Sequence, residues 1–331
     1  MMVREHDILA LDVNSKSKKC ISRTQLMRIL DDFDLMRILD DFDSRHFNEL
    51  NTVYFAGNLE YDGLYWQAID GKELRGNIDK VKGEKRAENV VFATHHSDRQ
   101  SSIIGTYSGK KASEKRVVAE YFENQQDLSS QAYSLDALHN SVSLLKEIAG
   151  KQGVYLTQIK GNQKNLLEGL KDLHDGFAPT SCFHTQEKAH RRIESRKAWV
   201  YPLQVEDLAK RWLKTKISSF LVIERAFSHV KSGKISHERS YYISNLEVSK
   251  QNDEVLFNAV RNHWLVESNN NIRDSNFGED QIKSFKNGLQ KSCAAFLTLV
   301  LNGLSKMNKD NNLVALREDL TYDRNMMFLF F

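Results

Sequence analysis

The sequence predicts an α/β fold, and three features of its pattern support that class. Between residues 65 and 173, short apolar runs with strand spacing alternate with amphipathic helical stretches. Residues 180–250 then carry several further strand patterns, which we interpret as a mostly β insertion. After residue 252 the pattern is mainly helical. The predicted fold is therefore a mixed sheet flanked by helices.

The composition is typical of a globular protein and excludes several other classes. The 331 residues carry 47 Lys+Arg against 44 Asp+Glu, a net charge of +3 that neither requires nor excludes nucleic acid as a partner. No apolar run reaches about 18 residues, so we expect no membrane span. The charged first twenty residues lack the apolar segment of a secretory signal. We therefore expect a cytoplasmic protein.

The cysteines and histidines do not indicate a zinc enzyme. Cys20, Cys182 and Cys293 are isolated, which fits a reducing compartment and provides no zinc-ligand spacing. The adjacent pair His95-His96 follows a predicted strand, and we interpret it as a structural or surface pair.

A tandem repeat lies near the N-terminus. Residues 26–34 and 35–43 both read LMRILDDFD, which indicates an in-frame duplication and not a solenoid, because there are two copies of a short unit. Nine residues turn a helix by about 180° net, so the two copies present their apolar sets to opposite sides. We expect a kink or loop near 31–34, or one copy that leaves the core, or a partner that covers it.

Three strands are predicted first, at Tyr65–Asp70, Asn89–Thr94 and Ser102–Tyr107. They follow one another with turn signals between them and no helical pattern, which predicts an antiparallel meander.

Helices and strands then alternate, which predicts parallel pairing between the strands. The elements in order are helix Ala112–Gln125, strand Gln131–Leu135, helix Asn140–Ala149, strand Val154–Lys160 and helix Gln163–Leu173.

The second half begins with the predicted β insertion and ends in helices. Its elements are strands Lys197–Leu203, Ser218–Ala226 and Glu238–Ile243, a short helix Val205–Lys214, and helices Asn252–Asn271 and Leu289–Lys306. The last residues, MMFLFF, are apolar, so we expect them to be packed.

Two aspartates follow predicted buried strands. Asp70 ends the first strand, and Asp136 follows the strand that ends at Leu135. Carboxylates on neighbouring strands repel one another unless a cation lies between them, and hard oxygen ligands favour Mg²⁺ or Mn²⁺ over zinc. The alternative is that each Asp caps a turn or a helix, and the two residues by themselves favour that alternative.

The surroundings of Asp70 are cationic. Lys72 and Arg75 lie in AIDGKELRG between two glycines that permit close backbone approach, which suggests an edge that faces phosphate. The alternative is a simple turn, since Asp-Gly is a strong hairpin signal.

A polar face also lies on the predicted helix around VRNHWLVE. His263 and Glu267 are four residues apart, share one face and could ligate a metal. The alternative is a surface polar pair with Trp264 in the core, and this segment by itself favours that alternative.

Five motifs in order carry a family resemblance, although each motif alone is weak. AIDGKELRG, SLDALH, KGNQK, EKAHRRIESR and RNHWLVES together resemble the DDE transposases of bacterial insertion sequences, in the branch that includes the H-repeat-associated proteins. The match extends from about residue 20 to 325. It implies an RNase-H-like core, a mixed sheet flanked by helices, with a mostly β insertion before the last catalytic acid.

The resemblance also implies a division of the chain. The expected segments are a truncated N-terminal helical segment with the duplication (1–60), the first part of the catalytic core (61–178), the β-rich insertion (179–250) and the C-terminal helical part of the core (251–331).

Position by position, the resemblance implies Asp70, Asp136 and Glu267 as a catalytic triad that holds two Mg²⁺ or Mn²⁺ ions, roughly 3.5–4 Å apart. The residues expected to contact DNA are Lys72, Arg75, Lys160, Asn162, Lys164, His190, Arg192, Arg196, Arg261 and His263. For Lys160, Asn162 and Lys164 the alternative is a plain turn. For His263 and Arg261 a role in orienting the site is equally open.

The segment Lys188–Arg196 supports DNA contact only if it is extended. Lys188, His190, Arg192, Glu194 and Arg196 would then share one mostly cationic face. The alternative is a solvated edge strand protected by its charge.

The chain departs from the family pattern after Glu267. Relatives read Glu-Asn, a His-Trp pair and then Asp, whereas here Ser268 follows Glu267 and Asp274 comes one residue earlier. One residue rotates a helix by about 100°, so we expect Asp274, Glu279 and Asp280 to be displaced.

The resemblance implies a metal-dependent DNA transposase. Its expected partners are the terminal inverted repeats and target DNA, on which it would act as a homo-oligomer associated with the bacterial nucleoid, without a membrane. Two alternatives remain: a catalytically inactive DNA-binding relic of a transposase, and a nuclease on the same core.

Overall fold

The computed structural model describes residues 44–56, 63–78, 87–108, 111–189, 192–204, 209–229, 235–282 and 287–307. All of these lie in one compact unit, Ser44–Phe331. The predictions for the tandem repeat and for the apolar tail fall outside the described residues.

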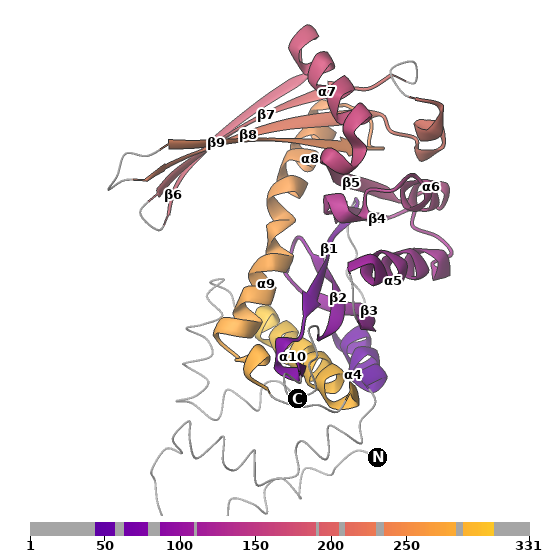
Figure 1. The fold of residues 1–331 in the computed structure, drawn as a ribbon, viewed down its shortest axis with the longest axis vertical. Coiled ribbons are helices and arrows are strands. Elements are labelled where there is room, and N and C mark those ends of the chain that lie inside the picture. The colour runs from indigo at the N-terminus through magenta and orange to yellow at the C-terminus, as the bar shows by residue number, and fades with distance from the viewer. Residues whose placement is uncertain are drawn as a thin grey trace, which may run out of the picture. The chain divides into compact units, whose positions relative to one another are not determined.

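In the part of the chain that the structure describes, the strands form one nine-stranded sheet (Figure 1). They are β1 (Tyr65–Glu73), β2 (Glu88–His95), β3 (Ser101–Ser108), β4 (Gln131–Leu135), β5 (Val154–Ile159), β6 (Ser181–Ala189), β7 (Arg192–Pro202), β8 (Ser219–His229) and β9 (Ile235–Ser244). Their order across the sheet is β3-β2-β1-β4-β5-β9-β8-β7-β6.

The first five strands have the predicted topology. β1, β2 and β3 pair antiparallel, which confirms the meander. β4 is parallel to β1 and to β5, which confirms the parallel pairing expected from alternating helices and strands. This mixed sheet is compatible with an RNase-H-like core. Because Ile69 pairs with Leu135, Asp70 and Asp136 follow that pair on neighbouring strands.

The remaining four strands are antiparallel and continue the same sheet from β5 through β9. The mostly β character predicted for residues 180–250 is confirmed, although β6 was not among the predicted strands. The helix predicted at Val205–Lys214 is described only from residue 209, and there it is a 3₁₀ segment, Lys210–Thr215.

Among the described residues, the α-helices are α4 (Ser44–Asn51), α5 (Lys111–Asn124), α6 (Val142–Gly150), α7 (Lys164–Gly176), α8 (Lys250–Asn262), α9 (Trp264–Ser275) and α10 (Asn287–Met307). Serines cap two of them: the Leu144 amide donates to Ser141 and the Asn252 amide donates to Ser249, as N-cap chemistry predicts. The single helix predicted at Asn252–Asn271 is instead two helices that meet at His263. None of the described helices is long and apolar enough to span a membrane.

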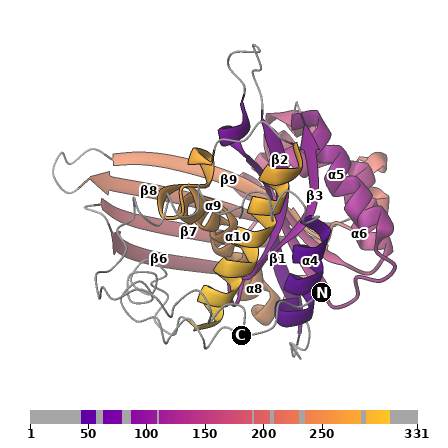
Figure 2. The ribbon, with the colours of Figure 1, turned by 90° about the horizontal axis from the view of Figure 1, so that it is seen from below.

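Helices cover both faces of the sheet (Figures 1 and 2). Apolar side chains of α5, α6 and α7 pack in one cluster with Ile69 and Leu135. On the opposite face, Val266 of α9 and Ala294 of α10 pack with Ala68. Since side chains alternate along β1, Asp70 and Lys72 share the face of Ala68 and are directed toward α9.

Candidate active site

Three carboxylates line one cleft of about 210 Å³. Asp70 comes from β1, Asp136 from the end of β4, and Glu267 from the first turn of α9. The structure therefore brings together the three acids that the motifs singled out, although strands β5 to β9 and helices α6 to α8 lie between Asp136 and Glu267 in the sequence.

Asp70 is half-buried and surrounded by other acids. The Nδ2 atom of Asn270 lies 3.5 Å from its Oδ2 atom. Burial raises the pKa of Asp70 to about 7, and the negative charges of Glu114, Glu267 and Asp136 add to that shift. A charged Asp70 is thus unfavourable without a compensating cation.

Asp136 acts as a cap and also faces the cleft, so the two interpretations of this residue are compatible. Its Oδ1 atom accepts a hydrogen bond of 2.6 Å from the Ala137 amide, at the start of the 3₁₀ turn Ala137–His139. Partial burial acts to raise the pKa of Asp136, but the Ala137 hydrogen bond and the Lys160 ammonium, 3.5 Å away, outweigh it and lower the pKa.

Glu267 is exposed at the mouth of the cleft. Desolvation raises the pKa of its carboxyl group and so does the charge of Asp136, while Lys160 and Arg225 oppose the shift. The charge of Asp136 thus acts on Glu267 across the cleft.

Ser134 links two histidines behind the carboxylates. Its hydroxyl lies 2.9 Å from Nδ1 of His263 and 3.0 Å from Nε2 of His96. Desolvation lowers the pKa of His263 to about 4 and that of His96 to about 3, so both imidazoles are neutral at pH 7. His263 therefore acts here as a neutral hydrogen-bonding group that fixes the α8–α9 junction to β4, which fits a role in orienting the site.

His96 and Ser134 were missed as site residues. His95-His96 was interpreted as a structural or surface pair, because histidines at a strand end do not by themselves indicate a functional site. Ser134 could have been found, because it lies two residues before Asp136 and thus on the same face of β4.

The far wall of the cleft was also missed, because its residues come from β8 and β9. Arg225, Glu238 and Tyr242 line it. The Arg225 guanidinium lies 5.1 Å from the centre of the Trp264 ring. Trp264 is 48% exposed and lines the same cleft, so the alternative that placed it in the core is wrong.

The carboxylates have the chemistry that a hard divalent cation prefers, since three acidic side chains line one cleft. Across the described ranges, however, no group of three or more His, Cys, Asp or Glu side chains lies close enough to hold a metal ion. The three acids line the cleft without forming a closed ligand shell.

Bacterial proteins share sequence with the chain, while no family model matches it. "Putative protein YbfL" of Escherichia coli K12 is 29% identical over 231 residues, which cover 65% of this chain and 57% of that protein. "Putative transposase YncI" of Escherichia coli O157:H7 is 30% identical over 210 residues, which cover 60% of this chain and 51% of that protein. "H repeat-associated putative transposase YbfD" of Escherichia coli K12 is 31% identical over 141 residues, which cover 39% of this chain and 51% of that protein.

The chain is a homologue of the H-repeat-associated proteins. The resemblance to transposases of the H-repeat branch is thereby confirmed. The chain spans about half the length of the relatives that it matches.

Several residues expected to contact DNA are exposed in the structure. The side chains of Lys160, Lys164 and Arg75 are 57%, 77% and 70% exposed, and Lys160 lines the cleft. Asn162 instead donates a hydrogen bond of 2.9 Å to the Ala137 carbonyl, which joins the turn after β5 to the turn after Asp136. Arg261 forms an ion pair with Glu187 of β6.

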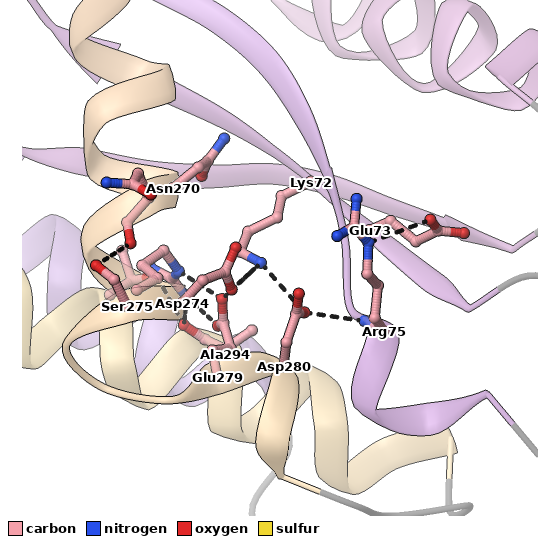
Figure 3. Close-up of polar contacts among 12 residues, drawn as sticks. Lys72, Glu73, Arg75, Asn270, Asp274, Ser275, Glu279, Asp280 and Ala294 are labelled. Carbon is pink, nitrogen blue, oxygen red and sulfur yellow. Dashed lines mark hydrogen bonds and ion pairs between the residues drawn. The ribbon is translucent and has the colours of Figure 1, made fainter.

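Lys72 does not lie at an exposed edge, so the prediction that it faces phosphate is wrong. Its side chain is 6% exposed, and its ammonium lies 2.6 Å from Asp274, 3.4 Å from Glu279 and 3.5 Å from Asp280 (Figure 3). The structure places these three acids around the Lys72 ammonium, and their displacement relative to the family pattern stays a prediction. They converge on one ammonium because the chain after α9 folds back toward β1.

The stretch Lys188–Arg196 is not one extended strand. Ala189 and Arg192 are partners in the antiparallel pair β6–β7, so the chain reverses between them. Lys188 is opposite Ile193 and shares its face, whereas Glu194 and Arg196 lie on the other face. No Gly or Pro marks this reversal in the sequence.

This reversal divides the expected cationic face. His190 lies outside the described residues, and Arg192 is described only by its place in β7. Arg196 is 18% exposed and forms ion pairs with Glu194 and Glu187.

Proposed function

We propose that the chain is a DDE transposase that cleaves and joins DNA strands at the ends of an insertion sequence in a metal-dependent reaction. The observation that supports this most directly is the single cleft lined by Asp70, Asp136 and Glu267. The names of its homologues, "Putative transposase YncI" and "H repeat-associated putative transposase YbfD", point to the same class.

In this proposal, Asp70, Asp136 and Glu267 hold two Mg²⁺ or Mn²⁺ ions. When bound, such ions activate a water or a 3′-hydroxyl and stabilise the leaving oxygen in an in-line phosphoryl transfer. The electrostatics of the site support cation binding, since neighbouring carboxylates and burial together raise the pKa of Asp70 to about 7.

The chain's own residues would also bind and orient the DNA. Lys160 gives the acidic cleft an exposed cationic group for a phosphate, and Arg225, which is 18% exposed and paired with Glu194, adds positive charge to the same cleft. Asn162 fixes the turn that carries Lys160, while Ser134 fixes His263 and thereby the start of α9. The partners would be terminal inverted repeats and target DNA, bound by a homo-oligomer at the nucleoid.

The first experiment measures Mn²⁺ binding by calorimetry at neutral pH, with and without a short DNA duplex. Wild type is expected to bind Mn²⁺, whereas Asp136→Asn is expected to lose that binding. Cleavage of a duplex that carries the flanking ends should fall on the order of 10³-fold in Asp70→Asn, because a metal ligand supplies several kcal/mol of transition-state stabilisation. Wild-type protein that is folded but binds no Mn²⁺ in the presence of DNA would contradict the proposal.

A second candidate is a catalytically inactive DNA-binding relic. The observation that favours it is the lack of a closed ligand group among the described residues. DNA binding with no metal-dependent cleavage would support the relic. Hydrolysis without strand transfer on any duplex would instead indicate a nuclease on the same core.

A further inference from the structure

The strand that carries Asp70 and the helix that carries Glu267 are joined by a second contact beyond Asp70. Asp70 and Lys72 are two residues apart on β1 and share a face. On α9, Asn270 and Asp274 are four residues apart and also share a face. Asn270 contacts Asp70 at 3.5 Å, and Asp274 contacts Lys72 at 2.6 Å (Figure 3).

The spacing of these two contacts matches on both elements. Two residues of a strand advance by about 6.6 Å, and four residues of a helix advance by about 6 Å. The strand and the helix therefore run alongside each other with both contacts satisfied. A slip of one residue on α9 would rotate the helix by about 100° and turn Glu267 and Asn270 away from Asp70.

Because Lys72 is buried, water cannot readily replace Asp274 as the partner of its ammonium. Lys72 is 6% exposed, and a buried ammonium must be paired with nearby carboxylates. Asp274 supplies one from α9, and Glu279 and Asp280 supply two from the following 3₁₀ turn, Glu279–Gln281. Glu279 also pairs with the buried Arg273 of α9, at 2.6 Å. The turn therefore closes against both the strand and the helix.

We propose that Lys72 is a positioning residue: through Asp274 it sets the register of α9 on β1 and so holds Glu267 and Asn270 opposite Asp70. This role rests on the proposed function, since it matters for catalysis only if these acids act together. It differs from the role expected from the motifs, in which Lys72 contacts DNA.

The register is tested by amide hydrogen exchange on two matched variants. Asp274→Asn removes the charge that ties Lys72 to α9, while Glu279 and Asp280 still neutralise the ammonium. Asp280→Asn removes a charge that lies 3.5 Å from the same ammonium but outside α9. We expect exchange across residues 264–275 to become about tenfold faster in Asp274→Asn and to change less in Asp280→Asn. Equal effects in the two variants, or no effect in either, would overturn the proposal.

The catalytic consequence is tested by Mn²⁺-dependent cleavage of the flanking ends. Asp274→Asn is expected to lower kcat on the order of 10- to 100-fold, because small displacements of catalytic groups are costly. Its DNA affinity and the salt dependence of that affinity should match wild type. Lys72→Arg should keep more activity than Lys72→Met. A weaker salt dependence in Lys72→Met, but not in the charge-conserving Lys72→Arg, with an unchanged kcat would instead make Lys72 a DNA contact.

The two proposals fail in different ways. If wild type neither binds Mn²⁺ nor cleaves DNA, the transposase proposal fails, and hydrogen exchange still decides whether Lys72 sets the register of α9. If wild type is active and the exchange of α9 is insensitive to Asp274→Asn, only the positioning role fails.

Discussion

At the residue scale, Gly71, the residue after Asp70, lies against the side chain of Glu114. Gly71 was expected to permit a close backbone approach, and the structure shows what approaches it. A Cβ atom at Gly71 would lie 2.6 Å from Cδ of Glu114. Glu114 is buried and cannot move aside easily, since Tyr107 donates to it at 2.7 Å and His139 lies 3.0 Å from it.

Gly71→Ala is therefore expected to destabilise the fold by about 1–3 kcal/mol, through the overlap with Glu114. The measurement is the free energy of unfolding in urea. Gly169→Ala on α7 is the control, because a Cβ atom there would meet nothing within 4 Å and alanine favours helices. That variant should gain up to about 1 kcal/mol. Equal stability in the two variants would contradict the predicted overlap.

The neutral histidines predict a pH dependence. The pKa of His96 is about 3 in the folded protein, against 6.5 ordinarily, so below pH 6.5 the unfolded chain binds more protons than the fold. Stability is thus lost as pH falls, by up to about 1.4 kcal/mol per pH unit for this histidine. His96→Gln lacks this contribution, and the gap between its unfolding free energy and that of wild type should change accordingly between pH 6 and 4.

The test compares wild type with His96→Gln at each pH, because other groups titrate in the same range and contribute equally to both proteins. His263 acts in the same direction as His96, whereas the raised pKa of Asp70 acts in the opposite one. His184→Gln, at an exposed position on β6, serves as the control and should follow wild type. A gap between wild type and His96→Gln that stays constant over this range would exclude a buried neutral His96.

At the scale of elements, α9 is the part of the site that depends most on packing. Val266, next to Glu267, is fully buried and packs with Ala68, Leu74 and Phe92. The apolar contact presses the helix onto β1, and the Lys72–Asp274 contact selects its register. Apolar packing is non-directional, so it holds the helix against the strand without fixing its register. The Lys72–Asp274 contact is directional, so it can fix the register.

Val266→Ala is expected to cost about 1–3 kcal/mol, since it leaves a cavity between α9 and the sheet. Thermal or urea unfolding measures the change. Val53→Ala, at a side chain that is 72% exposed, is the matched control and should stay within about 0.5 kcal/mol of wild type. A similar cost at both positions would mean that α9 is not packed as described.

At the scale of the whole molecule, the cleft brings together acids and cations from five separate parts of the chain. Lys160 follows β5 and Arg225 lies on β8, yet both line the cleft that holds the three acids. Under the proposed function this arrangement would suit a phosphodiester held beside bound cations, and each phosphate contact would add to the salt dependence of DNA binding.

Lys160→Ala is expected to weaken binding to any duplex and to lower the slope of log affinity against log salt by about 1. Fluorescence anisotropy at several salt concentrations measures that slope. Lys171→Ala removes an exposed lysine from α7, outside the cleft, and should leave the slope unchanged. An identical slope in wild type and Lys160→Ala would remove Lys160 from the proposed DNA interface.

Much of the fold could be predicted from the sequence, because its signals are local. The meander β1–β3 and the alternating elements that follow were expected, since strand and helix periodicities differ within a few residues. The reversal between Ala189 and Arg192 was not expected, because no turn residue marks it. The break at His263 was missed as well, since the helical pattern continues through it.

The sequence by itself determined which acids to consider, their order along the chain, and the relationship to the H-repeat-associated proteins. Only the tertiary structure decided which side chains share the cleft and which are withdrawn from it. Lys72 and Lys160 have the same chemistry in the sequence, but Lys72 is buried among three acids and Lys160 is exposed at the cleft. The physical reason is that the environment of a charge is set by elements that meet in space, and here Asp274 and Arg225 come from distant parts of the chain.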